Sequence, residues 1–230
     1  EGKVLKSSDH IIVTSNKTKQ LFSGITKQPI SVISNGFDIN YSSKTEIDSN
    51  FTLTHVGMLS TQRNPTILWK VLAELINELP HFKEKFKLVL VGNISIDVRA
   101  AINHYGLEPY LEHKGVVPHS LAVFHQKKSQ LLLLIEANTV EASYIIPAKL
   151  FEYLNSGRPI VALGPKSSDM CSILKETNTG SYFNYSDHSA LKAHLIQLFD
   201  IYQNNFLDVS ANGIERYSRR ACSKALAELF

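Results

Sequence analysis

Short apolar runs alternate along the chain with segments whose apolar side chains recur every three or four residues. The apolar runs predict buried strands at 9–16, 31–38, 51–59, 86–91, 111–117, 130–135, 160–163 and 181–183. The segments with helical spacing predict helices at 17–22, 65–79, 96–105, 121–128, 147–156, 168–177 and 189–202, and a last amphipathic helix that ends at 230. Strands that alternate with helices form βαβ units with right-handed crossovers. The pattern therefore predicts an α/β fold with a doubly wound parallel sheet and helices on both faces.

Several predicted strands end at residues that leave room for a ligand. Gly57 and Val117 lie near the ends of predicted strands, Gly92 follows another, and Pro147 comes after the loop that follows 130–135. Parallel sheets bind ligands outside the carboxyl ends of their strands, near the point where the strand order reverses. We therefore expect a ligand site near these residues.

The most informative local pattern begins at Pro147. This proline suits the first position of a helix, because its φ is already helical and its missing N–H has no partner to lose there. Gly157 is placed to end that helix in a left-handed cap, and 160–163 predicts a strand buried on both faces. Lys149 and Glu152 share one helix face. A cation, a carboxylate and the free N–H groups of a helix start suit a nucleotide diphosphate joined to a sugar. The alternative is a plain amphipathic helix with a surface Lys149–Glu152 pair.

The composition narrows the class of protein. Of 230 residues, 43% are hydrophobic and 20% are charged, as in a globular protein with an ample core. The formal net charge of +3 is small, and no basic run indicates nucleic acid binding. Cys171 and Cys222 lack metal-ligand spacing and favour a reducing compartment, with a single disulfide as the alternative.

The chain also lacks targeting and membrane signals. No apolar run reaches the length of a membrane span and no signal peptide is visible, so we expect a cytoplasmic protein. Because Glu1 already lies in sequence that leads into a strand, we expect the chain to be a fragment of a longer protein.

Other catalytic arrangements are missing from the sequence. It has no Ser–His–Asp order, no defensible pair of catalytic carboxylates and no His or Cys cluster with metal-ligand spacing. We interpret His55, His119 and His125 as structural or exposed. Gly-x-Gly-x-x-Gly and Walker-type loops are absent, which argues against a dinucleotide oxidoreductase or a P-loop ATPase. We expect no cofactor and no metal.

The segment 147–162, PAKLFEYLNSGRPIVA, resembles the donor-site signature of GT-B glycosyltransferases, specifically the large retaining family four, also called group one. Asn35–Asp38 and Gly57–Pro65 are further matches, and the resemblance covers nearly the whole chain. It implies the Rossmann-like C-terminal half of a GT-B fold. In that division, 1–40 is the end of the N-terminal domain and the interdomain entrance, 41–50 is a linker, and 51–230 is the nucleotide-sugar-binding domain with C-terminal helices.

The resemblance implies roles for individual residues. Arg63 and Lys149 would contact the diphosphate and stabilise it as it departs, which makes them the catalytic residues. Glu152 would accept hydrogen bonds from the ribose hydroxyls. The set implied to bind the nucleotide sugar is Gly57, Arg63, Asn93, Val116, Val117, Pro118, Pro147, Ala148, Lys149 and Glu152. The alternatives are a solvated loop arginine for Arg63, a surface pair for Lys149 and Glu152, and ordinary loop geometry at the strand ends.

One position departs from the family pattern. Members often carry another glutamate eight residues before the position of Glu152, where it approaches the donor sugar, but here that position is Tyr144. Glu141 and Glu136 lie nearby without that spacing. The means of recognising the donor sugar is therefore open.

The resemblance implies a hexosyltransferase of polysaccharide biosynthesis, which moves a hexosyl unit from a nucleotide diphosphate sugar to a glycan or lipid-linked acceptor. The acceptor would be held by a missing N-terminal domain of the same protein, so we expect this fragment alone to be inactive. Docking of the parent protein on the inner membrane face is left open. The alternatives are a GT-B nucleotide-sugar epimerase and a non-catalytic flavodoxin-like regulatory or scaffold module.

Overall fold

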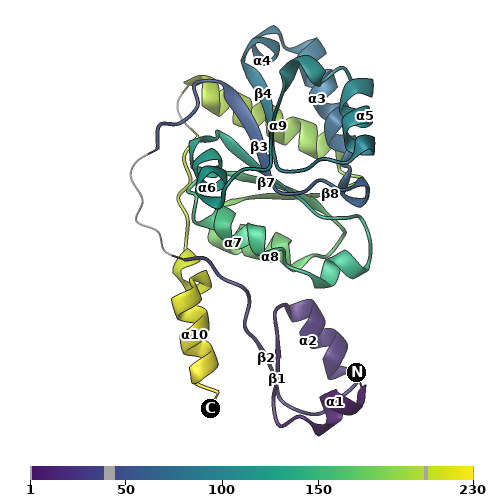
Figure 1. The fold of residues 1–230 in the computed structure, drawn as a ribbon, viewed down its shortest axis with the longest axis vertical. Coiled ribbons are helices and arrows are strands. Elements are labelled where there is room, and N and C mark those ends of the chain that lie inside the picture. The colour runs from purple at the N-terminus through teal and green to yellow at the C-terminus, as the bar shows by residue number, and fades with distance from the viewer. Residues whose placement is uncertain (1, 39–44, 205–206, 230) are drawn as a thin grey trace.

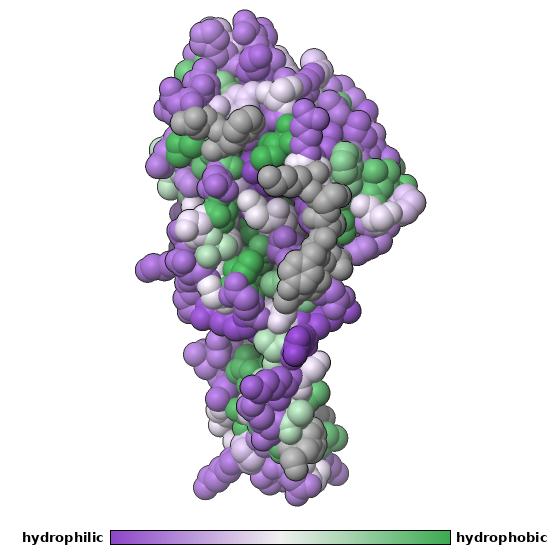
Figure 2. All heavy atoms as spheres, turned by 90° about the vertical axis from the view of Figure 1, so that its left-hand side faces the viewer, coloured by the Kyte–Doolittle hydropathy of each residue, from purple (hydrophilic) through white to green (hydrophobic). Residues whose placement is uncertain are grey.

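A computed structural model of the chain describes residues 2–38, 45–204 and 207–229. Its larger part is a sheet covered by helices on both faces, and a narrower part below it holds both ends of the chain (Figure 1, Figure 2). The larger part contains the strand ends at which a ligand site is expected.

Six parallel strands form the sheet of the larger part. They are β3 Phe51–Val56, β4 Phe86–Val91, β5 Leu111–Gly115, β6 Leu131–Ile135, β7 Ile160–Gly164 and β8 Gly180–Asn184, in the order β5-β4-β3-β6-β7-β8. All neighbouring strands pair in parallel. β3, β6 and β7 are buried along their whole length, which explains why β6 and β7 are continuously apolar. The predicted doubly wound parallel sheet is confirmed.

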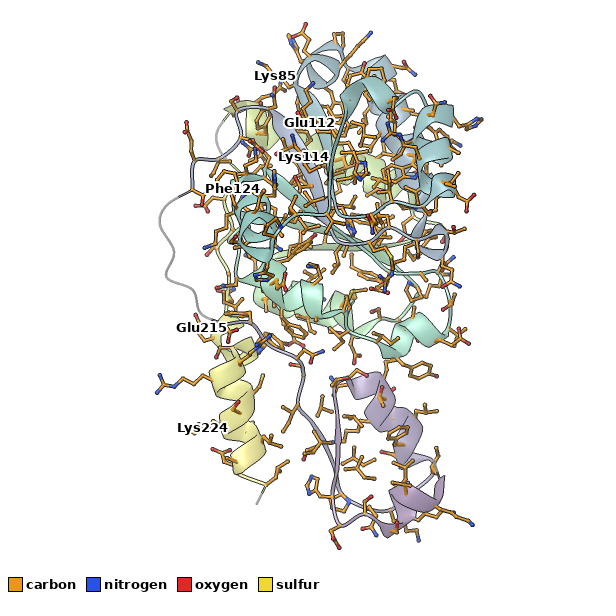
Figure 3. All side chains as sticks on the ribbon, viewed as in Figure 1. Lys85, Glu112, Lys114, Phe124, Glu215 and Lys224 are labelled. Carbon is orange, nitrogen blue, oxygen red and sulfur yellow. The ribbon has the colours of Figure 1, made fainter. Side chains whose placement is uncertain are left out.

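Helices cover both faces of this sheet. α3 Thr66–Glu78, α4 Pro80–Lys85, α5 Ile96–His104 and α9 His188–Asn204 pack on one face, and α6 His119–Lys128, α7 Ala148–Leu154 and α8 Asp169–Thr177 pack on the other. Each face buries an apolar stripe of its helices, as Leu68, Leu72 and Leu75 of α3 illustrate. Side chains fill the space between the sheet and the helices on both sides (Figure 3).

The narrower part is a small unit with a separate core. It contains α1 Gly2–Ser7, β1 Ile11–Val13, α2 Asn16–Ser23 and β2 Ile30–Val32, with the two strands paired in parallel, and α10 Arg219–Ala227 lies in the same part (Figure 1). The chain passes between the two parts twice. At the passage Phe37 N donates to Tyr217 O over 3.0 Å, and Arg219 N donates to Phe37 O over 2.8 Å. These bonds hold the segment after β2 against the segment that leads into α10.

Some local predictions differ from the structure. Helix α7 begins at Ala148, because Pro147 has a ψ of 135° and is still extended. The helix ends at Leu154 with Asn155 as its cap, and Gly157, although left-handed with φ 71°, turns the chain into β7 instead. Helices α1 and α4 were not predicted, because each has only six residues and is too short to show a clear period.

The predicted linker 41–50 lies partly outside the described residues. Its last part, from residue 45, has no helix or strand. Asp48 Oδ1 pairs with Lys128 Nζ at 2.9 Å, and the Asp48 carbonyl accepts a hydrogen bond from Gln130 Nε2 over 2.6 Å. These contacts tie that last part to the sheet domain. The division of the chain into 1–40, 41–50 and 51–230 stays a prediction.

Candidate functional site

The strand order reverses between β3 and β6. From β3 the chain runs outward through β4 to β5, and from β6 it runs outward through β7 to β8. The carboxyl ends of the two central strands are followed directly by Gly57 and Glu136. Ligands of doubly wound sheets bind in the crevice at this reversal. The candidate site therefore consists of the groups that reach these two strand ends.

Two glycines let the loops after β3 and β4 run close together. Gly57 and Gly92 have φ of 145° and 120°, a conformation that other residues rarely adopt. A Cβ on Gly92 would lie 2.4 Å from the carbonyl oxygen of Gly57. Gly57 N donates to Val91 O over 2.8 Å, and Leu59 N donates to Asn93 O over 2.9 Å. These contacts fix the backbone at the end of β3.

Helix α7 brings Lys149 and Glu152 to this strand end. Lys149 Cε lies 3.9 Å from the position that a Cβ on Gly57 would occupy. The Lys149 ammonium donates to Glu152 Oε2 over 3.1 Å. The two side chains are 29% and 33% exposed, so both are partly buried and neither is turned out into bulk water.

Glu152 has two further neighbours, both on α6. Gln126 Nε2 donates to Oε2 over 3.1 Å, and His119 Nε2 lies 3.8 Å from Oε1. Burial raises the pKa of Glu152, but the charge of Lys149 and the hydrogen bonds from Gln126 and Lys149 outweigh burial, so the pKa lies below its usual value. Glu152 is therefore an ionised acceptor at neutral pH. It borders a cavity of about 110 Å³ that Asp38 and Arg219 also line.

A second cation, Arg63, comes from the loop after β3. Its Nη2 lies 3.1 Å from Oε2 of Glu136, the residue directly after β6. Arg63 is 38% exposed, whereas the Glu136 side chain is only 4% exposed. Burial raises the pKa of Glu136, and Arg63 offsets only part of that rise. The Glu136 carbonyl accepts a hydrogen bond from the Tyr185 hydroxyl over 2.8 Å. Glu136 thus anchors Arg63 across the two central strand ends.

His55 of β3 lies next to Gly57 in the same site. Its side chain is buried, and Nδ1 donates to the Leu133 carbonyl of β6 over 2.9 Å. Burial lowers the pKa of His55 to about 4; the bond to Leu133 opposes this shift, and the charges of Lys149 and Arg63 add to it. The ring is therefore neutral at neutral pH.

Sequence reasoning missed the parts that Glu136 and His55 play in the site. It weighed Glu136 only against the spacing of a family glutamate, and it interpreted His55 as structural or exposed. The available signal was position: both residues lie at the carboxyl ends of the two central strands, where a polar side chain inside an apolar run is unusual.

The loop after β5 approaches the same site from the side of α6. Val117 is partly buried and Pro118 immediately precedes α6, whose first residue is His119, the neighbour of Glu152. Val116 is 74% exposed. The structure therefore brings the 117–119 segment to the Glu152 carboxylate and leaves Val116 facing solvent.

The other predicted site residues contribute backbone more than side chain. Pro147 and Ala148 carry the chain into α7 beside Lys149, and Ala148 is exposed at the cavity that Glu152 borders. Asn93 is exposed and contributes its carbonyl to the contact with Leu59. Their predicted roles toward a nucleotide sugar stay predictions.

Tyr144, at the position where the family often has a glutamate, ties the loop after β6 to α2. Its carbonyl accepts hydrogen bonds from Ser15 Oγ over 2.7 Å and from Thr18 Oγ1 over 3.2 Å. A cavity of about 590 Å³ opens at the carboxyl ends of β6, β7 and β8. Its lining includes Lys17, Asn138, Tyr144, Lys166, Asn184 and Tyr185. Through Tyr185, this cavity adjoins Glu136.

Acidic, histidine and cysteine side chains are dispersed over the described part of the chain. Within residues 2–38, 45–204 and 207–229, no group of three or more of them is placed to hold a metal ion. Among the helices of those residues, none is both long and apolar enough to cross a membrane.

No family model matches this sequence, and no curated protein matches it. Solved structures do match its fold. Sucrose-phosphate synthase from Thermosynechococcus elongatus superposes with a TM-score of 0.74 at 14% identity, over 99% of this chain and 59% of that one. HepE from Anabaena, solved in complex with UDP, gives 0.75 at 18% identity, over 96% of this chain and 63% of that one. The pneumococcal O-GlcNAc transferase GtfA, in complex with UDP and GlcNAc, gives 0.69 at 19% identity, over 99% and 46%.

The likeness to these structures concerns the fold. The chain spans between 46% and 63% of the length of these three proteins. Its sheet, its helices on both faces and its C-terminal return to the smaller unit are the fold of a GT-B C-terminal domain. The fold that the segment 147–162 predicted is confirmed.

Proposed function

We propose that this chain is the nucleotide-sugar-binding domain of a retaining GT-B glycosyltransferase of family four. The parent enzyme transfers a hexosyl unit from a nucleotide diphosphate sugar to a glycan or lipid-linked acceptor. One observation carries the proposal: Lys149 of α7, paired with Glu152, reaches the carboxyl end of β3, where the strand order reverses, and Arg63 from the loop after β3 pairs with Glu136 at the end of β6.

The diphosphate is assigned to the two cations. Lys149 gives one N–H to Glu152 and keeps the remaining donors for phosphate oxygens. Arg63 uses part of its guanidinium fork on Glu136, and its exposed remainder can still donate to an oxygen anion. Two positive charges at the strand ends stabilise a leaving diphosphate most when the glycosidic bond breaks, because negative charge develops there. The proposed chemistry needs no metal ion.

The ribose is assigned to Glu152. An ionised carboxylate accepts hydrogen bonds from two neighbouring hydroxyls, and the low pKa of Glu152 keeps it ionised. Gln126 and His119 already hold the carboxylate from α6. The 117–119 segment beside it is the nearest backbone for the base. The cavity at the ends of β6, β7 and β8 adjoins Glu136 through Tyr185 and is large enough for a sugar ring.

The solved neighbours support the same class of ligand. HepE and GtfA were each solved with UDP, and the fold of this chain matches both. UDP is therefore the first nucleotide to test, with GDP and ADP beside it because no group of the site reads a particular base. Transfer itself would require the acceptor-holding domain of the parent protein, so we expect none from this chain alone.

The test is a melting measurement with UDP, GDP or ADP at millimolar concentration. A ligand that binds only the folded state stabilises it by about 2.7 kcal/mol at a hundredfold excess over its Kd. We expect one of the three to raise the melting temperature of the wild type, and the double variant Lys149→Met, Glu152→Gln to lose that rise.

The matched control for this test is Lys192→Met. Lys192 also pairs with glutamates, Glu74 and Glu78, but it does so on α9, on the opposite face of the sheet from α7. This variant should keep the nucleotide response. If UDP, GDP and ADP all leave the wild-type melting temperature unchanged, the chain is not a donor domain and a scaffold role becomes the better explanation.

A further inference from the structure

His55 carries a hydrogen-bond acceptor that the rest of the site leaves unused. Among the described residues, its Nε2 is buried and has no hydrogen-bond partner. Buried polar atoms are nearly always paired, so such an atom in a candidate site calls for a partner. The side chain is 5% exposed, so the nitrogen is not simply hydrated by bulk water.

The contact with Leu133 determines which ring nitrogen carries the proton. A carbonyl oxygen can only accept, so Nδ1 must carry the hydrogen that it shares with Leu133 O over 2.9 Å. In a neutral ring, Nε2 then has a lone pair and no proton. Burial keeps the ring neutral, with a pKa of about 4. Nε2 is therefore an acceptor at neutral pH.

This nitrogen and the stem of Lys149 both lie close to Gly57. A Cβ built on Gly57 would lie 3.4 Å from His55 Nε2 and 3.9 Å from Lys149 Cε. The absence of a side chain at Gly57 leaves this position to the imidazole on one side and the lysine on the other. The Lys149 ammonium sits one bond beyond Cε and has three N–H donors, of which Glu152 Oε2 takes one.

We propose that His55 is a positioning residue for Lys149, whose ammonium it accepts through Nε2 when a ligand occupies the Glu152 carboxylate. This inference rests on the proposed function, in which ribose hydroxyls bind Glu152. As the ribose takes over the Glu152 oxygens, the lysine loses its present partner. His55 then holds the ammonium over Gly57, and the remaining N–H groups point to the diphosphate.

The chemistry of the three groups favours this arrangement. A diphosphate oxygen placed directly against Nε2 would set acceptor against acceptor, so a donor must lie between them, and Lys149 is the donor at hand. A carboxylate in place of His55 would also hold the lysine, but its negative charge would repel the diphosphate. A neutral imidazole takes one N–H and leaves the positive charge of the lysine available to the ligand.

The first test measures binding of UDP, GDP and ADP to variants of His55 by titration calorimetry. His55→Phe keeps a ring and loses the acceptor, and His55→Gln keeps an amide oxygen at similar reach. We expect His55→Phe to weaken binding of the best nucleotide by about fivefold to tenfold, the scale of one ordinary hydrogen bond. His55→Gln should stay within about twofold of the wild type.

A double-mutant cycle separates positioning from mere structural support. In a Lys149→Met background the residue that His55 holds is gone, so adding His55→Phe should change affinity little. If His55→Phe weakens binding by the same factor with and without Lys149, His55 does not act through the lysine and the inference is overturned.

The second test needs no nucleotide, so it remains decisive even if all three nucleotides fail to bind and the proposed function falls. The imidazole ¹⁵N signals of His55 are measured in the wild type, in Glu152→Ala and in Glu152→Ala combined with Lys149→Met. Removing Glu152 frees the lysine, and we expect the Nε2 signal to shift toward that of a hydrogen-bonded nitrogen. The added Lys149→Met should return the signal to its wild-type position. An Nε2 signal that does not move in Glu152→Ala would overturn the inference.

Discussion

The candidate site contains two cation–carboxylate pairs with the same separation and different surroundings. Lys149–Glu152 and Arg63–Glu136 both close at 3.1 Å. Glu152 is one-third exposed and has a lowered pKa, because Lys149, Gln126 and His119 outweigh its burial. Glu136 is 4% exposed and has a raised pKa, because burial outweighs Arg63. The two pairs therefore have the same contact distance, but the pKa of the carboxylate is lowered in one and raised in the other.

This difference in burial determines which of the two ion pairs can change partners. The Lys149–Glu152 pair is partly hydrated and lies on one short helix, and such a pair contributes only about 0.3–0.5 kcal/mol. A ligand can therefore take over either partner at little cost. Leaving a buried carboxylate without its cation costs about 2 kcal/mol here, because Arg63 is itself partly exposed, so Glu136 keeps Arg63 in place. We interpret Arg63 as the fixed cation of the site and Lys149 as the adaptable one.

The largest expected effect is on stability at low pH and comes from His55. The charges of both Lys149 and Arg63 lower the pKa of this residue, so it tests whether the two pairs share one buried environment. Its pKa is about 4 in the fold against 6.5 as the ordinary value. Between these values the unfolded chain binds more protons, so the stability from the neutral ring is present above pH 6.5 and is lost as the pH falls toward 4. At pH 4.5 this loss amounts to about 2–3 kcal/mol.

Urea unfolding at pH 7.5 and pH 4.5 measures this loss. Carboxylates also titrate over that range, so the matched control is His55→Gln, which removes only the titrating ring. We expect the wild type to lose about 2–3 kcal/mol more than His55→Gln between the two pH values. Equal losses in the two proteins would mean that the ring is not held neutral by burial between the cations.

The next largest effect distinguishes the two cations by how much each contributes to the free energy of unfolding. Arg63→Met leaves Glu136 buried without its partner and should lower the free energy of unfolding at pH 7.5 by about 2 kcal/mol. Lys149→Met is the matched control, and it should change that free energy by less than about 0.5 kcal/mol, because Glu152 is partly hydrated.

The pH dependence of the Arg63 effect follows from the raised pKa of Glu136. A carboxyl group with a raised pKa destabilises the fold only when it is ionised, so its cost is absent below the unfolded pKa and grows as the pH rises through the folded pKa. The difference between Arg63→Met and the wild type should therefore shrink at pH 5. A loss of stability in Lys149→Met as large as that in Arg63→Met would erase the distinction between the pairs.

Much of this fold could be predicted from the sequence, because local patterns carry it. Strand β4 was predicted with its observed bounds at 86–91, since every residue but Lys87 is apolar, as is typical of a buried parallel strand. The placement of Lys149 and Glu152 on one helix face followed from their spacing alone. The GT-B fold was predicted from the same segment and its context, and the match to solved structures confirms it.

The unpredicted parts depend on contacts between distant segments. Arg63 and Glu136 are 73 residues apart and meet only because β3 and β6 are neighbours, which the sequence does not state. The unpaired nitrogen of His55 likewise depends on Leu133 of the adjacent strand and on the bare backbone of Gly57. Predicting such contacts requires the order of the strands in the sheet as well as their positions in the sequence.

The smallest of the three effects concerns Glu152. It tests whether the Lys149–Glu152 pair binds a ligand or is an ordinary surface ion pair. Glu152→Gln keeps the shape and one acceptor oxygen but removes the negative charge. We expect it to weaken nucleotide binding by about 1–2 kcal/mol, because hydrogen bonds from ribose hydroxyls to a charged group are stronger than those to an amide. The measurement is a calorimetric titration with whichever of UDP, GDP and ADP binds the wild type best.

Glu74→Gln is the matched control for this variant, because Glu74 also pairs with a lysine and is similarly exposed, but it lies on α3 with its partner Lys192 on α9. The control should bind nucleotide like the wild type, and both variants should unfold within about 0.5 kcal/mol of it. If Glu152→Gln and Glu74→Gln gave the same titration curve as the wild type, Glu152 would be a surface carboxylate like Glu74. The Lys149–Glu152 pair would then bind no ligand, and it would differ from the Arg63–Glu136 pair only in its burial.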